Sequence, residues 1–197
     1  KWGGFLKDIR GFDAAFFKIS RREAELMDPQ QRIMLEEAWH AIEDAGIRPS
    51  SLAGSRTGVF IGVANTDYDE LLIRNGNRLD AYTSTGFYFS IIPNRISYFL
   101  NLKGPSLAID SACSSALVAI HEAVKALQVG ECEMALAGGV NIIITPRRYF
   151  SFSNAGMLAK DGRCKTFDAR ADGYVRGEGA GVVLLKPLKK AVEDGDA

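Results

Sequence analysis

The sequence predicts an α/β fold with a mainly parallel sheet between helices. Two kinds of segment alternate along the chain: short runs of β-branched and small apolar residues, and longer runs with apolar residues three or four positions apart. Glycine and proline separate these segments, as they do in βαβ units. The 197 residues are 47% hydrophobic and 24% charged, which is enough apolar sequence to form a buried core.

Charge, cysteine and histidine content exclude several classes of protein. Lys plus Arg and Asp plus Glu each number 24, so the net charge is zero and we expect no nucleic-acid partner. No apolar run approaches the ~18 residues of a membrane span, so we expect no membrane segment. The three cysteines form no C-x-x-C pair, and with only two histidines they give no metal-binding pattern. We therefore expect free thiols and a cytoplasmic protein.

The first helices are marked by their capping residues. Ser20 followed by Glu23 is a capping box, which predicts a helix that ends before Pro29. Asp28 then caps a second helix, with Pro29 at its first position and Gly46 as its stop. The apolar residues of this second helix recur at helical spacing and are Met34, Leu35, Ala38, Trp39, Ile42 and Ala45.

Four further elements follow up to the middle of the chain. Residues 57–63 are rich in β-formers and predict a buried strand. Residues 67–74 predict a helix. The segment 90–100 predicts another, which begins near Ile92 because a proline follows directly. Residues 106–110 predict a second strand after a Gly-Pro turn.

The last third repeats the alternation. Residues 114–129 predict a long apolar helix that stops at the next glycine, and a strand lies within 133–144. A glycine-rich segment, 173–181, leads into a last strand at 182–185. The final residues, 186–197, begin an amphipathic helix. We expect residues 1–197 to be one piece of a larger unit, because neither end has the composition of a terminus and no internal linker divides the chain.

The sharpest candidate for chemistry is Cys113. It follows the strand 106–110 and a tight turn, at the point where the long helix begins. Free N–H groups and the helix dipole favour a thiolate at such a place, and the same N–H groups suit a developing oxyanion. Small neighbours leave room for a substrate, namely Ala112, Ser114, Ser115 and Ala116. The alternative is a buried structural cysteine.

Long segments of the chain resemble the β-ketoacyl synthase domain of modular polyketide synthases. The matching segments are GFDAAFFKIS (11–20), DPQQRIMLEEAWHAIEDAGI (28–47), GVFIGV (58–63), STGFYFSIIPNRISYFLNLKGPS (84–106), DSACSSALVAIH (110–121), ALAGGVNIIITP (135–146) and GRCKTFDARADGYVRGEGAGVVLLKPL (162–188). They cover nearly the whole chain in order. Ser111 and Ala116 are mild departures from the family, which has Thr and Ser there.

The resemblance implies a thiolase-like fold, with a mixed sheet layered between helices, of which residues 1–197 are the first half without the opening strand. It implies that Cys113 accepts an acyl chain from the phosphopantetheine arm of an acyl carrier protein, with its backbone N–H as an oxyanion donor. A malonyl-type extender then loses CO₂ and condenses with this thioester. No bound cofactor or metal is implied, because the phosphopantetheine belongs to the carrier. The resemblance further implies a homodimer in the intact parent, with the strand before Cys113 at the seam.

The histidines of this chain do not fit the family's chemistry. The family uses two histidines, in HGTGT and N-x-G-H motifs, which are absent here together with its catalytic lysine. His121 lies two helical turns from Cys113, about 12 Å along the axis, so we expect it to pack between helices. His40 is expected at the surface or in packing. The chain alone is therefore expected not to condense. A non-elongating, acyl-passing ketosynthase and a non-catalytic partner or binding fragment remain alternatives.

Other features have structural and functional interpretations. Glu178, within GEGAG, is interpreted as a buried, hydrogen-bonded carboxylate in a tightly turning segment, not as part of a phosphate loop. The aromatic run 87–89 predicts core packing, or the lining of an acyl channel or dimer seam. Cys132 and Cys164 are expected to be ordinary thiols. A loose basic set is either a solvated face or a docking surface for an acidic carrier protein, and consists of Arg147, Arg148, Lys160, Arg163 and Lys165.

Overall fold

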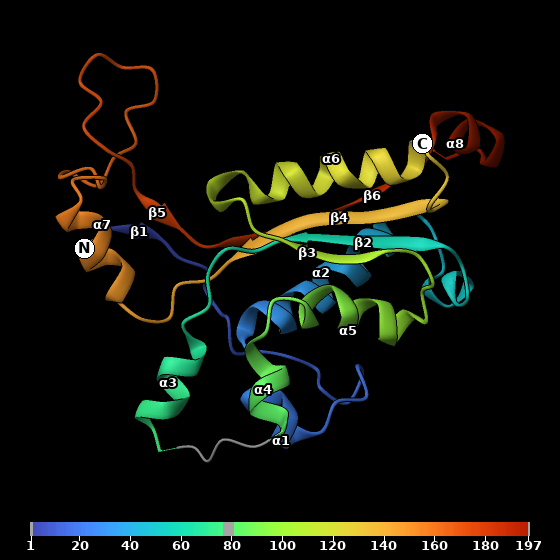
Figure 1. Cartoon of the computed structure of the whole chain (residues 1–197), viewed down its shortest axis with the longest axis horizontal. Helices are drawn as coiled ribbons and strands as arrows, with labels where there is room; N and C mark the ends of the chain where they lie inside the picture. Colours follow the sequence, from blue (N-terminus) through green and yellow to red (C-terminus); the bar gives the residue numbers. More distant parts are fainter. Residues whose placement is uncertain (1, 77–80, 197) are drawn as a thin grey trace.

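The computed structural model describes residues 2–76 and 81–196. Its main sheet has four strands in the order β3-β2-β4-β6 (Figure 1), with β2 at Thr57–Gly62, β3 at Ser106–Ile109, β4 at Met134–Asn141 and β6 at Gly179–Leu185. Strands β3, β2 and β4 are parallel, and β6 runs antiparallel to β4. The predicted α/β fold with a mixed sheet is confirmed.

Helices cover both faces of this sheet. Helix α6, Ser115–Gln128, lies along one face, while α2, Pro29–Asp44, and α5, Ile91–Leu100, lie on the other (Figure 1). All six residues of β2 are buried, because this central strand is covered on both sides. The three layers leave the carboxyl ends of the parallel strands together at one edge, where open α/β sheets usually carry their sites.

The two faces of the sheet are packed differently. On the α2 side, the core contains large side chains such as Met34, Ile42 and Leu136. On the α6 side, the buried residues of the cluster are mostly small and are Phe60, Ala119, Ala123, Ala126, Cys132, Ala135 and Ala137. Because alanine occupies little volume, helix α6 packs close to the strands.

The remaining described elements lie around this core. They are β1 Gly3–Gly4, α1 Arg21–Leu26, η1 Pro49–Leu52, α3 Tyr68–Arg74, α4 Ala81–Phe87, η2 Ala112–Ser114, α7 Arg147–Asn154, β5 Arg176–Gly177 and α8 Leu188–Asp194. Strands β1 and β5 form a separate parallel pair. The sequence does not predict β1, α4 or α7, because their glycine, serine and threonine residues are weak indicators of strand or helix.

The predicted caps of the first two helices are present. The Ser20 Oγ accepts the N–H of Glu23 at 3.2 Å, and the Asp28 Oδ1 accepts the N–H of Gln30 at 2.8 Å. The Glu23 carboxylate is engaged by Arg95 of α5 at 2.6 Å. The residue expected to complete a local capping box thus ties α1 to α5.

Two predicted boundaries need correction. Strand β6 begins at Gly179 and not at Val182, because the glycine-rich segment continues the antiparallel ladder to Asn141 at the end of β4. Ala45 was expected on the buried face of α2, but it is exposed, because the helix ends one residue earlier and Ala45 is its C-cap.

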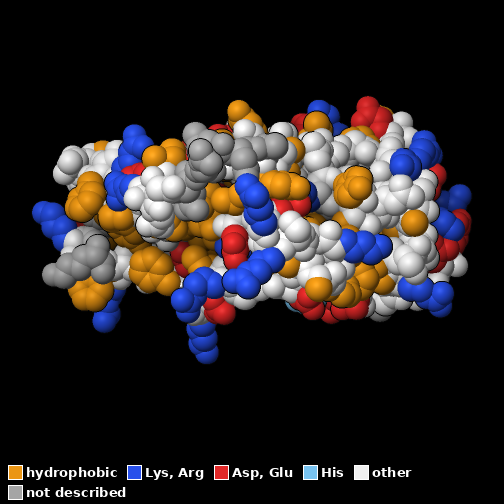
Figure 2. All heavy atoms as spheres, turned by 90° about the horizontal axis from the view of Figure 1, so that it is seen from below, with side chains coloured by type: hydrophobic (Ala, Val, Ile, Leu, Met, Phe, Trp, Pro, Cys, Tyr) orange, Lys and Arg blue, Asp and Glu red, His pale blue; other side chains and the backbone are white. Residues whose placement is uncertain are grey.

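Figure 2 shows the face that lies below in Figure 1, where hydrophobic side chains are interspersed with both basic and acidic ones. Large hydrophobic side chains exposed on the molecule include Ile73, Tyr88 and Tyr98. Among the described residues, no helix is long and apolar enough to cross a membrane.

Candidate active site

Cys113 lies where strand β3 leads into helix α6. The strand ends at Ile109, the short turn η2 spans Ala112–Ser114, and α6 begins at Ser115. The Cys113 side chain is exposed, unlike the buried structural cysteine of the alternative interpretation. The predicted strand–turn–helix arrangement around this residue is confirmed.

Side chains of the turn hold its backbone on both sides of Cys113. The Asp110 Oδ1 accepts the N–H of Ala112 at 2.9 Å. The Ser115 Oγ accepts the N–H of Ser111 at 3.0 Å and donates to the Ala112 carbonyl at 2.6 Å. The Ser114 Oγ donates to the Ser111 carbonyl at 2.8 Å. These bonds fix the direction in which the chain enters α6, and with it the position of the thiol.

Ala112, the residue before Cys113, has a left-handed backbone. Its φ is +56°, which costs an L-residue with a Cβ roughly 1–2 kcal/mol. Backbone strain of this kind persists only where the surroundings impose it, and it is typical of residues beside a nucleophile.

Replacing Ala112 by glycine is expected to raise the free energy of unfolding by about 0.5–1 kcal/mol. Glycine adopts a positive φ without steric cost, although its greater freedom in the unfolded chain offsets part of the gain. Ala112→Val is the opposite control, because a β-branched residue tolerates this φ less well than alanine. Urea unfolding measures both variants, and a glycine variant less stable than the native chain would contradict the prediction.

The ends of two central strands press against the first turn of α6. A Cβ added at Gly62 would lie 2.5 Å from the backbone nitrogen of Ala116, and one at Gly139 would lie 2.7 Å from the Ala116 Cβ. These distances leave no room for a side chain, so glycine is required for the close approach. The strand ends and Cys113 therefore border the same space.

A cavity of about 770 Å³ opens beside Cys113. Its wall comes from the loop 62–65, the end of β4 at 139–141, the segment 176–180 and helix α7, at the end of the sheet where α6 begins (Figure 1). This volume falls within the range of small-molecule sites, roughly 300–1,000 Å³. The arrangement gives Cys113 room for a substrate.

The cavity wall carries positive charge and aromatic rings. Arg148 and Arg176 both line it. Arg176 is 6% exposed, and its guanidinium carbon lies 5.0 Å from the ring centroids of both Tyr149 and Phe152. Burial raises the pKa of Tyr149 and of Tyr174, and the positive charge of Arg176 opposes this rise in both. The Cys113 cavity is thus partly apolar and partly cationic.

Glu178 also lines the cavity, but its carboxylate is occupied by backbone groups. Its Oε1 accepts the N–H of Ile143 and its Oε2 accepts the N–H of Leu6, both at 2.9 Å. The expected hydrogen bonding of this carboxylate is confirmed. The residue is only half-buried, however, and its neighbours belong to strands β5 and β6, where a tight turn was expected.

Neither histidine takes part in this site. His40 on α2 and His121 on α6 are both exposed, and no histidine lines the cavity within the described ranges. The packing role expected for His121 is therefore wrong, because the buried stripe of α6 passes through its alanines on the opposite side. The described residues also contain no group of three or more His, Cys, Asp or Glu that could hold a metal ion.

The other two cysteines differ from Cys113 and from each other. Cys132 is buried in the cluster beneath α6. Cys164 is exposed, and its Sγ accepts the N–H of Val175 at 3.1 Å. Their expected status as ordinary thiols agrees with these positions, since neither lines the Cys113 cavity.

Cys132 is expected to react with iodoacetamide at least about ten times more slowly than Cys164 at pH 8. Burial raises the pKa of the Cys132 thiol, and only the thiolate reacts. The pKa of the Cys132 thiol is higher in the folded chain than in the unfolded chain. Its contribution to the free energy of unfolding is therefore fully present below the unfolded-state pKa and is lost as the pH rises through the folded-state pKa. Peptide mass spectrometry measures both rates, with the urea-unfolded chain as control, and equal rates in the folded chain would refute the prediction.

The aromatic run 87–89 lies away from the Cys113 cavity. Phe89 packs against the core on the α2 side, whereas Tyr88 is 59% exposed. The ring of Phe87, which is half-buried, lies 5.3 Å from that of Tyr88. Core packing is thus confirmed for Phe89, and an acyl channel through the run finds no support in the lining of the Cys113 cavity.

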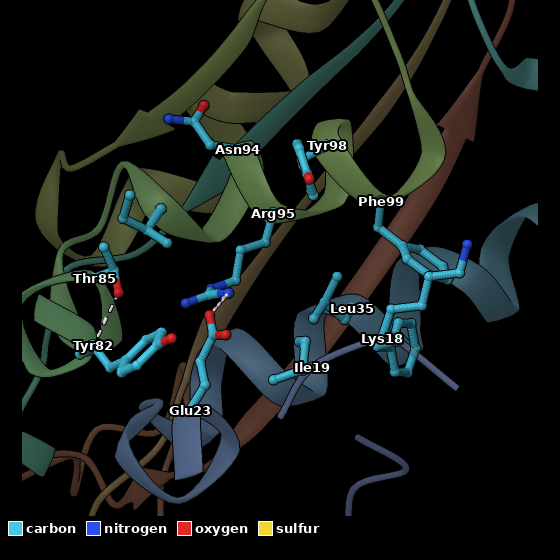
Figure 3. A pocket seen from close by; sticks show the side chains of 12 residues that line it. Lys18, Ile19, Glu23, Leu35, Tyr82, Thr85, Asn94, Arg95, Tyr98 and Phe99 are labelled. Atoms are coloured by element: carbon cyan, nitrogen blue, oxygen red, sulfur yellow. Dashed lines mark hydrogen bonds and ion pairs between the residues drawn. The ribbon is translucent and has the colours of Figure 1, made fainter. Parts of the chain in front are cut away.

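A second cavity, of about 740 Å³, lies among α1, α2, α4 and α5 (Figure 3). Arg95 and Glu23 form their ion pair in its wall, and Leu35 and Phe99 supply apolar lining. No cysteine or histidine lines it in the part of the chain that the structure describes. We therefore expect no cysteine- or histidine-based chemistry at this second cavity.

The basic set lies at the same end of the molecule as Cys113. Arg147 and Arg148 belong to α7, and Lys160, Arg163 and Lys165 to the loop that follows it (Figure 1). Lys165 is held by two aspartates, at 2.8 and 2.6 Å. The other four charges are mostly exposed, and Arg148 reaches the cavity wall.

This geometry agrees with the comparison to known families. The model of the β-ketoacyl synthase N-terminal domain matches residues 1–191. The chain belongs to the β-ketoacyl synthase family. The resemblance stated from the sequence motifs is thereby confirmed.

The similar proteins are large polyketide synthases. The chain is 53% identical to the polyketide synthase ThaG of Burkholderia thailandensis and 55% identical to PksN of Bacillus subtilis, in each case over 100% of this chain and 4% of the relative. It is also 55% identical to a phenolphthiocerol/phthiocerol polyketide synthase protein of Mycobacterium tuberculosis, of which it covers 13%. The chain thus spans a small part of the curated relatives that it matches.

Two solved structures with the same fold are ketosynthases. The ketosynthase from module 6 of the bacillaene synthase of Bacillus subtilis 168 superimposes with a TM-score of 0.90 and 49% identity, over 99% of this chain and 33% of that chain. The oxazolomycin ketosynthase domain of Streptomyces albus JA3453 superimposes with a TM-score of 0.90 and 43% sequence identity, over 99% of this chain and 35% of that chain. The predicted thiolase-like class is therefore confirmed, with this chain matching about a third of each.

Sequence reasoning missed part of the cavity wall. Phe152, Tyr174 and Arg176 were not singled out, although all three line the cavity. A signal was present, because Tyr174, Arg176 and Glu178 alternate as residues on one face of a strand do. Phe152 belongs to α7, whose sequence gives little indication of a helix.

Proposed function

We propose that this chain forms the acyl-accepting part of a β-ketoacyl synthase in polyketide biosynthesis, with Cys113 as its nucleophile. The observation that carries the proposal is the exposed Cys113 thiol at the start of α6, held in a strained turn and facing a cavity. The names of the relatives and of the solved neighbours support it.

In the first step, the Cys113 thiolate attacks the carbonyl carbon of an acyl thioester on the phosphopantetheine arm of an acyl carrier protein. A carbon–sulfur bond forms, the carbonyl oxygen takes the negative charge, and the backbone N–H of Cys113 stabilises it. The bond to the pantetheine sulfur then breaks, and this sulfur leaves as a thiolate that takes up a proton. The acyl group remains on Cys113 as a new thioester.

In the second step, a malonyl-type extender loses CO₂, and the resulting carbanion attacks the Cys113 thioester. The Cys113 thiolate is released, and the acyl chain is joined to the extender. The resemblance assigns the stabilisation of the developing charges in this step to two histidines, and the described cavity wall contains no histidine. We therefore expect this chain by itself to accept an acyl group but not to condense.

The proposal includes partners of defined chemistry. The exposed cations Arg147, Lys160 and Arg163 suit an acidic carrier protein that delivers its arm to the cavity. Strand β3 is an edge strand of the sheet, which supports a homodimer of the intact parent with this strand at the seam. We expect no resident cofactor or metal. The free cysteines suit a reducing compartment, and we place the protein in the cytoplasm.

The test is acylation of the full chain by a short acyl thioester of N-acetylcysteamine. Intact mass is expected to show a single acyl group per chain, and peptide mass spectrometry is expected to place it on the peptide that contains Cys113. Labelling of Cys164 to the same extent would contradict the proposal, because both thiols are exposed and only Cys113 lies at the cavity.

A further inference from the structure

Asp28 and Gln30, at the start of α2, are buried polar residues with no role in the chemistry above. They are 3% and 2% exposed, respectively. Buried polar groups are hydrogen-bonded in folded proteins, so the partners of these side chains indicate which segments they hold in place.

Gln30 joins the two segments that leave the central strands. Its Nε2 donates to the carbonyl of Asn65 at 2.7 Å, and its Oε1 accepts the N–H of Ile142 at 3.3 Å. Asn65 lies in the loop after β2, and Ile142 directly follows β4. One side chain of α2 thus bonds to both segments at the edge of the sheet where Cys113 lies.

The bonded segments form part of the wall of the Cys113 cavity. Asn65 and Asn141 both line it, and the Asn65 Nδ2 donates to the Asn141 Oδ1 at 3.1 Å. The Asn141 Nδ2 in turn donates to the carbonyl of Gly177 at 2.7 Å, on the next part of the wall. Hydrogen bonds therefore connect Gln30 through Asn65 and Asn141 to the Gly177 part of the cavity wall.

Asp28 adds a second attachment to the same loop. Its Oδ2 accepts the hydroxyl of Thr66 at 2.8 Å, directly after Asn65, and its Oδ1 accepts the N–H of Gln30. The start of α2 thus binds the loop after β2 at two consecutive residues.

We propose that Gln30 is a positioning residue for the acyl-accepting site, an inference that rests on the proposed function of Cys113. Gln30 does not line the cavity. It acts through Asn65 and Asn141, because its hydrogen bonds hold these two residues in position beside Cys113. A displacement of about 1 Å in such a wall is enough to slow a reaction by up to about a hundredfold.

The neighbouring Gln31 provides a matched control. It is 1% exposed, its Nε2 donates to the carbonyl of Thr85 at 2.9 Å, and its Oε1 accepts from the Arg95 Nε at 2.8 Å. Thr85 and Arg95 lie at the second cavity (Figure 3), and neither lines the Cys113 cavity. The two glutamines are thus equally buried and similarly bonded, but only Gln30 is connected to the Cys113 site.

The experiment compares Gln30→Met and Gln31→Met in the full chain. Both variants are expected to lower the melting temperature by similar amounts, since each leaves a partly buried carbonyl without its donor. With the N-acetylcysteamine thioester, Gln30→Met is expected to lower the maximal rate of Cys113 acylation about tenfold. Gln31→Met is expected to stay within about twofold of the native rate. Alkylation of Cys113 by iodoacetamide, relative to Cys164 in the same molecule, is measured in parallel.

Equal effects of the two variants on acylation would overturn the inference, because they would reflect lost stability alone. Native acylation in Gln30→Met would overturn it as well. If the native chain takes up no acyl group on Cys113, the proposed function fails. The positioning role of Gln30 is then tested by the ratio of the iodoacetamide alkylation rates of Cys113 and Cys164. A ratio that changes in Gln30→Met and not in Gln31→Met supports the positioning role, and a ratio unchanged in both refutes it.

Discussion

The Cys113→Ala variant is expected to take up no acyl group from a thioester donor, a fall of at least about a thousandfold in the transfer rate. The reaction needs a sulfur that forms a bond to the carbonyl carbon while the bond to the donor sulfur breaks, and alanine supplies no such atom. Cys113→Ser is expected to be nearly as inactive, because a hydroxyl without a neighbouring base is a weak nucleophile. Intact mass after incubation with the thioester measures the uptake.

Cys164→Ala is the matched control for this prediction. It removes the other exposed thiol and is expected to leave acylation of Cys113 unchanged. Thermal unfolding of all variants separates lost chemistry from lost structure. An acyl adduct on Cys113→Ala at the native level would show that another residue accepts the chain.

The Gly62→Ala variant is expected to lose about 3 kcal/mol or more of folding free energy. The added Cβ would lie 2.5 Å from the backbone N of Ala116 and the backbone C of Ser115, and neither atom moves away by a change of rotamer. The end of β2 or the first turn of α6 must therefore shift, and we expect this shift to displace Cys113. Urea unfolding measures the loss, and slowed acylation of the folded fraction reports the displacement.

Gly181→Ala is the control for Gly62→Ala. Gly181 also lies in a strand, and a Cβ there would meet no heavy atom within 4 Å. Its replacement is expected to change stability by less than about 1 kcal/mol. Equal losses in the two variants would show that the effect is a general response of strand glycines and not a result of the contact with α6.

The elements with strong local signals were predictable from the sequence. Helix α2 has Asp28 as its N-cap, a proline at its first position and regular apolar spacing. Strand β2 is a short run of β-formers that fits a strand buried on both faces. The turn at Cys113 was predictable for the same reason, because its strand, small residues and helix start follow one another directly in the chain.

The remaining features depend on contacts between distant segments. The start of β6 is set by its pairing with β4, about 40 residues earlier, and no local pattern specifies that partner. The cavity wall combines α7 with β5, so Arg176 meets Tyr149 and Phe152 only in the folded chain. His121 was misplaced because the burial of α6 follows its small residues, Ala119 and Ala123, and not the largest side chains nearby.

The alanine stripe under α6 also has an entropic consequence for the nucleophile. Alanine has no side-chain rotamers to lose, so Ala119, Ala123 and Ala126 are buried without the ordering cost that leucine or methionine would carry. A helix anchored mainly through such residues has few alternative side-chain packings among which it can fluctuate. Cys113 therefore lies directly before a helix that is attached to the sheet at little entropic cost.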